Sequence, residues 1–279
     1  MPKFTNYYLN NMKTILITGL DGSGKSTIFE KMKQQAAVSK VKFLFVPHID
    51  LSEFSPESQE FKVATCINEM SAVADREQLT QIKAVALFLA MLFFKKLLDF
   101  QRMSKPEIIF FERHPLIDTS IYAQFYAPKL AQNTIPTRVN EYFESNYSHE
   151  LDFLIQLLPK QLLTIQKPKL TIFTDFIYTW FFVEKQNTIS DLQTLFGVEL
   201  PTKIYYLKAD APILYQRIKS RARKEAHENE LVLSKLAEAY ENYLTNLAQS
   251  QPNLIEFIDA NNLQSLDNFA EKLLLQLKG

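Results

Sequence analysis

One short stretch near the start of the chain has the residue types and spacing of a phosphate-binding loop. Residues 19–27 read Gly-Leu-Asp-Gly-Ser-Gly-Lys-Ser-Thr, which satisfies the pattern G-x-x-x-x-G-K-[ST]. Glycines let successive main-chain N–H groups point at phosphate oxygens, and the helix expected after them adds its positive N-terminal end. Lys25 can reach the β- and γ-phosphates of ATP, and the Ser26 hydroxyl can coordinate Mg²⁺. The predicted nucleotide site comprises Gly19, Asp21, Gly22, Ser23, Gly24, Lys25, Ser26 and Thr27.

A second group of reactive side chains occurs in residues 110–115, Phe-Phe-Glu-Arg-His-Pro, where a predicted strand ends. The Glu112 carboxylate can orient Mg²⁺ or its waters across from Ser26. Arg113 can hold a substrate oxygen or the transferring phosphoryl group. The alternative is a solvated Glu-Arg pair at a strand end. We expect His114 to shape the turn rather than to catalyse.

Arginines cluster later in the chain, within residues 216–225. Arg217 and Arg221 are four residues apart and therefore share a helix face. A mobile segment that carries Arg217, Arg221 and Arg223 can close over ATP and neutralise charge on the moving phosphoryl group. The alternative is a solvated basic helix end, which the helix dipole favours.

These residues need a scaffold, and the hydrophobic pattern indicates one. Short apolar runs without clean alternation are typical of strands covered on both faces, and here they alternate with longer helical patterns. The pattern predicts an α/β fold, a doubly wound five-stranded parallel sheet with helices on both faces, whose ligands lie beyond the carboxyl ends of the strands. The predicted strands are Thr14–Thr18, Lys42–Val46, Ile108–Phe111, Lys203–Leu207 and Leu254–Ile258, and the predicted helices are Lys25–Ser39, Arg76–Arg102, Ala211–Arg223, Val232–Ser250 and Asp267–Leu277.

The stretch from about 127 to 200 is less regular, with several prolines and many aromatic residues. Its Leu170–Phe173 run fits either a strand or a helix. We interpret this stretch as a helical insertion in a single domain that spans 1–279 and carries a lid at about 217–230. After the last strand, Ala260 and Asn261 are placed to lie against adenine, although an ordinary strand–helix turn fits them equally well.

Composition limits the classes of partner. Of 279 residues, 31 are Lys or Arg and 31 are Asp or Glu, so no broad charge attracts nucleic acid or an anionic membrane. The one cysteine excludes an internal disulfide and fits a reducing compartment. The longest apolar run, Ala84–Phe94, is shorter than the about 20 residues that cross a bilayer. We therefore expect a cytoplasmic protein with no membrane or nucleic-acid partner, in which this run is core or, alternatively, a homodimer face.

Taken in this order, the motifs resemble the superfamily of deoxynucleoside kinases and thymidylate kinases. Residues 19–27 are more similar to the P-loop of thymidylate kinases, whereas Phe-Glu-Arg-His-Pro at 111–115 is more similar to the nucleoside kinases. The resemblance implies the P-loop kinase fold, ATP and Mg²⁺ as cofactors, and a nucleoside or nucleotide as substrate. It also implies that Asp118 lies near the base and Tyr122 against its face, and that Glu225 or Glu228 contacts the sugar.

One segment departs from the family. After the second strand, nucleoside kinases carry Pro-Glu-Pro, whose Glu accepts the 5′-hydroxyl proton, and thymidylate kinases carry Arg-Glu-Pro, whose Arg holds the substrate phosphate. Residues 46–50 here read Val-Pro-His-Ile-Asp. The missing arginine argues against a monophosphate substrate, and the missing glutamate leaves His48 or Asp50 as the general base.

Three functions follow from these motifs. The first is ATP-dependent phosphoryl transfer to the 5′-hydroxyl of a (deoxy)nucleoside, with a thymidine-like substrate. The second is a nucleoside monophosphate kinase of the thymidylate kinase type, which converts dTMP to dTDP. The third is a nucleotide-binding regulator that has lost kinase chemistry. The base, the sugar and the oligomeric state stay open at this point.

Overall fold

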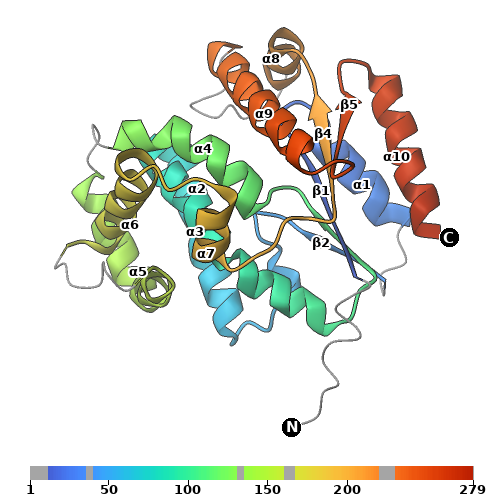
Figure 1. The fold of residues 1–279 in the computed structure, drawn as a ribbon. Helices are drawn as coiled ribbons and strands as arrows, with labels where there is room; N and C mark the ends of the chain where they lie inside the picture. The colour runs from blue at the N-terminus through green and yellow to red at the C-terminus, as the bar shows by residue number, and fades with distance from the viewer. Residues whose placement is uncertain (1–11, 36–39, 131–134, 160–166, 220–229, 279) are drawn as a thin grey trace. The chain divides into compact units, whose positions relative to one another are not determined.

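A computed structural model describes residues 12–35, 40–130, 135–159, 167–219 and 230–278 (Figure 1). They form two units. The first unit is drawn from 1–44, 99–113 and 200–279, and the second from 45–98 and 114–199.

The first unit is built on a parallel sheet of five strands in the order β2-β3-β1-β4-β5. All five predicted strands are confirmed, with ends that differ from the prediction by two residues at most. The central strand β1 is buried from Ile15 to Gly19. The strands are β1 (Lys13–Gly19), β2 (Val41–Leu44), β3 (Ile108–Phe111), β4 (Lys203–Lys208) and β5 (Ile255–Asp259).

Two neighbouring tyrosines of β4 show that helices cover both faces of this sheet, because successive strand side chains point to opposite faces. The Tyr205 ring meets the Phe269 ring of α10 (Leu263–Lys278), with centroids 4.9 Å apart. The Tyr206 ring stacks on Tyr240 of α9 (Glu230–Ser250) at 5.5 Å. Helix α1 (Lys25–Gln35) packs beside α10, and α8 (Ala211–Lys219) packs beside α9 (Figure 1). The predicted doubly wound α/β class is therefore confirmed.

The predicted helix Arg76–Arg102 is in fact the end of one helix and most of the next. Helix α2 (Gln59–Glu77), which we did not predict, ends at Gln78, whose backbone is left-handed with φ 56°. Helix α3 (Thr80–Met103) then begins. No glycine or proline stands between the two helices to mark this break.

The last helix also begins earlier than predicted, at Leu263 rather than Asp267. Asn262 explains the difference, because its Oδ1 accepts the N–H of Gln264 at 2.8 Å and satisfies the first turn.

The second unit is helical. The Leu170–Phe173 run lies in a helix, and every side chain of Ala84–Phe94 except Leu87 is buried, which supports the interpretation of that run as core. Trp180, the only tryptophan in the sequence, stacks on Phe176 with centroids 5.3 Å apart. Besides α2 and most of α3, the unit contains η1 (Leu51–Glu53), α4 (Pro115–Leu130), α5 (Thr137–Gln156), α6 (Lys169–Ile177), the π-helix η3 (Tyr178–Val183) and α7 (Ile189–Phe196).

None of the helices within the described ranges is both long and apolar enough to span a membrane.

Candidate nucleotide-binding site

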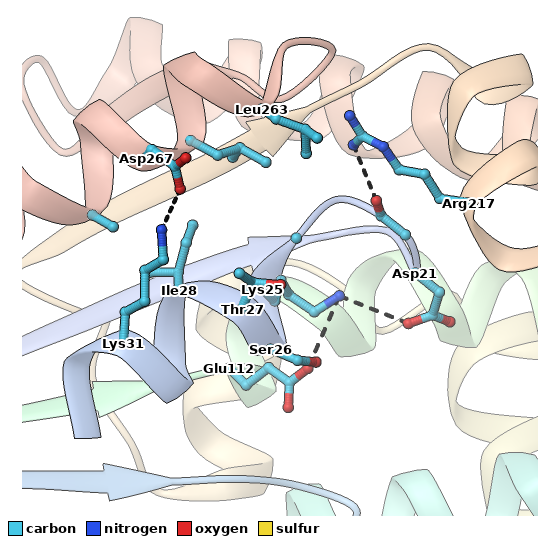
Figure 2. Close-up of a pocket in the computed structure, with 14 residues that line it drawn as sticks. Asp21, Lys25, Ser26, Thr27, Ile28, Lys31, Glu112, Arg217, Leu263 and Asp267 are labelled. Carbon is cyan, nitrogen blue, oxygen red and sulfur yellow. Dashed lines mark hydrogen bonds and ion pairs between the residues drawn. The ribbon is translucent and has the colours of Figure 1, made fainter. Parts of the chain in front are cut away.

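A cavity of about 240 Å³ opens in the first unit at the carboxyl end of β1 (Figure 2). The P-loop and the first turns of α1 form one wall, and α10 forms another. The predicted residues Asp21, Gly22, Gly24, Lys25, Ser26, Thr27, Glu112 and Arg217 line it together with Ile28, Lys31, Leu263, Leu266, Asp267 and Ala270.

The Lys25 ammonium is the centre of the polar wall and is only 4% exposed. Its Nζ donates to the main-chain oxygens of Gly19 at 2.8 Å and Leu20 at 3.1 Å. Two carboxylates balance its charge, Asp21 at 3.7 Å and Glu112 at 4.0 Å. Hydrogen bonds and opposite charges of this kind compensate for the burial of an ammonium group, and Lys25 lines the cavity.

Two P-loop glycines let helices lie directly against the loop. Gly22 has φ +86°, and a Cβ there would lie 2.9 Å from the main-chain oxygen of Leu214 on α8. Gly24 has φ +99°, and a Cβ there would lie 2.8 Å from Leu266 Cδ1 on α10. Any other residue would be strained at both positions. At Gly22 it would also meet the main chain of α8, whereas at Gly24 it would meet the end of the Leu266 side chain.

The polar groups of the loop fit a nucleotide phosphate with Mg²⁺. The Ser26 hydroxyl and the Glu112 carboxylate line the same cavity and supply hard oxygen ligands. No group of three His, Cys, Asp or Glu side chains suited to a metal occurs among the described residues. Mg²⁺ usually takes one or two protein ligands and completes its shell with phosphates and water, so the Ser26 and Glu112 oxygens suffice to hold it. Thr27 is exposed beside Ser26, whereas Ser23 is fully buried.

Arg113 lies at the same edge of the sheet, where β3 ends. Its guanidinium is 3.8 Å from Asp21 Oδ1, so Asp21 bridges the Lys25 and Arg113 cations. The sequence prediction placed Glu112 and Arg113 beside the P-loop, and the structure brings all three together.

Arg217 lies at the cavity, but its guanidinium is bonded to the main chain. It donates to the oxygens of Gly22, Ala260 and Asn261 at 3.2, 2.8 and 3.0 Å. Ala260 is fully buried, and the Asn261 side chain accepts the N–H of Asp210 at 2.8 Å. The remaining predicted lid residues, Arg221, Arg223 and Glu225, as well as Glu228, lie outside the described residues.

Sequence reasoning missed the wall that α10 contributes. Leu263 is 67% exposed and, with Leu266, gives the cavity an apolar side. Lys31 of α1 forms an ion pair with Asp267 across this wall (Figure 2). The predicted start of the helix at Asp267 left Leu263 and Leu266 in a loop, so no helical spacing pointed to them.

The predicted substrate-side residues of α4 lie in the second unit and are buried. The Asp118 carboxylate accepts the N–H of His114 at 2.7 Å, at the start of the helix. Burial lowers the pKa of His114 to about 3, and the neutral ring accepts the N–H of Leu116 at 3.3 Å. His114 therefore shapes the turn. Tyr122 stacks on Tyr126 at 6.1 Å, and both rings line a small apolar cavity of about 30 Å³.

The two candidate bases also lie in the second unit. Asp50 Oδ1 accepts two hydrogen bonds from Ser52, from its N–H at 3.0 Å and its hydroxyl at 2.7 Å, and so caps η1. His48 is exposed.

The fold and the cavity define an α/β protein with a P-loop, and solved structures agree with that class. No protein-family model and no curated protein matches the chain. A thymidylate kinase structure from Candida albicans is 15% identical over 96% of this chain and 93% of that chain, with a TM-score of 0.52. A deoxyadenosine kinase structure from M. mycoides, with the products dCMP and a flexible dCDP bound, is 16% identical over 93% of this chain and 98% of that chain, with a TM-score of 0.50. The chain therefore has the fold of the P-loop nucleoside and nucleotide kinases.

Proposed function

We propose that this chain is an ATP-dependent kinase that phosphorylates the 5′-hydroxyl of a (deoxy)nucleoside, with a thymidine-like substrate. One observation carries the proposal: a buried, charge-balanced ammonium, Lys25, shares a cavity with the Ser26 hydroxyl and the Glu112 carboxylate. This is the donor set that holds nucleotide phosphates and their Mg²⁺.

Bound ATP with Mg²⁺ supplies the phosphoryl group and neutralises much of its charge. On the donor side, Lys25 and the P-loop amides hold the phosphates, and Ser26 and Glu112 hold the metal. Arg113, which Asp21 orients, stabilises the transferring group together with lid arginines. The described geometry supports this role better for Arg113 than for Arg217, whose guanidinium is bonded to main-chain oxygens.

On the acceptor side, we favour His48 over Asp50 as the group that accepts the hydroxyl proton. Asp50 already caps η1 through its bonds with Ser52, whereas the His48 ring is exposed and an imidazole can accept a proton from a hydroxyl group. Asp118, Tyr122 and Glu225 stay the predicted contacts to the nucleoside. Three further expectations remain predictions. They are a single domain over 1–279 with an insertion at 127–200 and a lid at 217–230, a cytoplasmic location, and a homodimer.

One observation favours a second function, a nucleoside monophosphate kinase that converts dTMP to dTDP. Residues 19–27, taken together, are more similar to the P-loop of thymidylate kinases than to that of nucleoside kinases. The lack of an arginine near Pro47 argues against this function.

The test is a substrate panel with the purified full chain, ATP and Mg²⁺, read as phosphorylated product. The panel holds thymidine, the other deoxynucleosides, the ribonucleosides and dTMP, with the Lys25→Ala protein as a control for contaminating kinases. We expect product from a nucleoside. Turnover of dTMP alone would reject the leading proposal in favour of the second function. ATP binding without any product would favour a regulator.

A further inference from the structure

We propose that Arg217 is a positioning residue that ties the P-loop to the loop between β5 and α10, and so sets the affinity for the nucleotide. This inference concerns the site of the proposed function, and its kinetic test rests on that function.

The guanidinium contacts both loops at once. Nη1 donates to Gly22 O at 3.2 Å and to Ala260 O at 2.8 Å, while Nη2 donates to Asn261 O at 3.0 Å. Figure 2 shows the Arg217 side chain reaching toward the P-loop. A planar fork of N–H donors can bind three carbonyl oxygens in fixed directions, which a lysine ammonium on a flexible stem cannot reproduce.

The helix that carries Arg217 is itself fixed against the same two loops. The main chain of α8 approaches Gly22 so closely that a Cβ there would lie 2.9 Å from Leu214 O. At the start of α8, the N–H of Asp210 is held by Asn261 Oδ1 at 2.8 Å. Ala260 is anchored in turn, because its N–H donates to Lys208 O of β4 at 2.7 Å. Arg217 thus completes a closed set of contacts among the P-loop, α8 and the β5–α10 loop.

Two roles for Arg217 can be distinguished by the kinetic constant that its loss would change. A guanidinium that acts on the transferring phosphoryl group would affect kcat, and a lysine would keep much of its charge effect. A guanidinium that positions the loops would affect the binding of the nucleotide, and its loss would be similar in Arg217→Lys and Arg217→Ala. We expect the second pattern.

The kinetic test compares wild type, Arg217→Ala, Arg217→Lys and, as a matched control, Lys235→Ala, which removes an exposed cation of α9. Both Arg217 variants should raise the KM for ATP about tenfold with kcat within about threefold of wild type, since hydrogen bonds to a charged donor are lost. The KM for the acceptor should not change, and Lys235→Ala should match wild type. A fall in kcat of more than about thirtyfold with an unchanged KM for ATP, or no change in either constant, would overturn the proposal.

A second readout needs no kinase activity and so separates this inference from the proposed function. Amide hydrogen exchange is measured with and without ADP. In wild type we expect ADP to slow exchange in residues 20–24 and also in 260–262. In Arg217→Lys the effect in 260–262 should be lost while that in 20–24 remains. Equal protection of both segments in the variant would contradict the proposal that Arg217 ties the two loops together, whatever the substrate panel shows.

Discussion

The Nζ atom of Lys25 lies 4.0 Å from Oε1 of Glu112, although one residue follows β1 and the other follows β3. The register of the sheet explains this proximity, because β1 and β3 pair in parallel with Leu16 opposite Phe111. The two strands therefore end at the same edge, and the residues that follow them meet there. Strand pairing thus brings the cation that we propose to hold the phosphates and the carboxylate that we propose to hold the metal to one edge of the sheet.

The Lys25→Ala protein should lose at least about 100-fold in kcat/KM, because an ammonium aimed at the phosphates cannot be replaced by water. Its affinity for ATP should fall as well, measured by titration calorimetry. Lys272→Ala, which removes an exposed lysine of α10, is the matched control and should keep both values. A Lys25→Ala protein with normal turnover and ATP affinity would exclude the P-loop as the donor site.

The Glu112→Gln protein should need about tenfold or more Mg²⁺ for half-maximal rate, because the amide keeps an oxygen ligand but loses its charge. The measurement is the phosphorylation rate over a Mg²⁺ titration. Glu107→Gln removes a carboxylate just before β3 that pairs with Lys40 on the surface, and it should not change the Mg²⁺ requirement. The same Mg²⁺ dependence in Glu112→Gln as in wild type would remove Glu112 from the metal site.

The Asp118→Ala protein should lose about 1–3 kcal/mol in free energy of unfolding, because the buried N–H of His114 loses its acceptor. Asp118→Asn keeps an acceptor oxygen and should lose less. Urea unfolding of both variants gives these values. The resemblance to nucleoside kinases predicts a contact with the base instead. A changed base preference in Asp118→Asn, with no loss of stability in either variant, would favour that contact over the capping role.

The buried His114 should make the fold sensitive to acid. Burial lowers its pKa from 6.5 to about 3, so between these values the unfolded chain takes up a proton that the folded chain does not. Stability is therefore full above about pH 6.5 and falls as the pH drops toward 3, by about 2 kcal/mol between pH 7 and pH 5.

Urea unfolding at these two pH values tests the effect. His114→Gln should flatten the pH dependence by that amount, whereas the exposed His149→Gln should leave it unchanged. An equal slope in wild type and His114→Gln would show that the ring is protonated in the folded state.

The sheet and the P-loop could be predicted because they depend on local pattern. Each strand is a short apolar run, and the glycine spacing at 19–24 determines the turn that follows β1. The apolar wall at Leu263 and the break at Gln78 could not be predicted, because the first depends on a helix start set by Asn262 and the second on a left-handed residue with no glycine. The hydrogen bonds of Arg217 could not be predicted either. Its three acceptors are main-chain oxygens, which every residue type carries.

Trp180 provides a fluorescence signal that reports on the second unit separately from the first. It is the only tryptophan in the sequence, and it lies in η3 of that unit, whereas the P-loop cavity belongs to the first. Its fluorescence emission is thus an intrinsic optical probe of one half of the molecule while ADP is titrated into the other. A shift in that emission would measure directly how far nucleotide occupancy is transmitted along the chain.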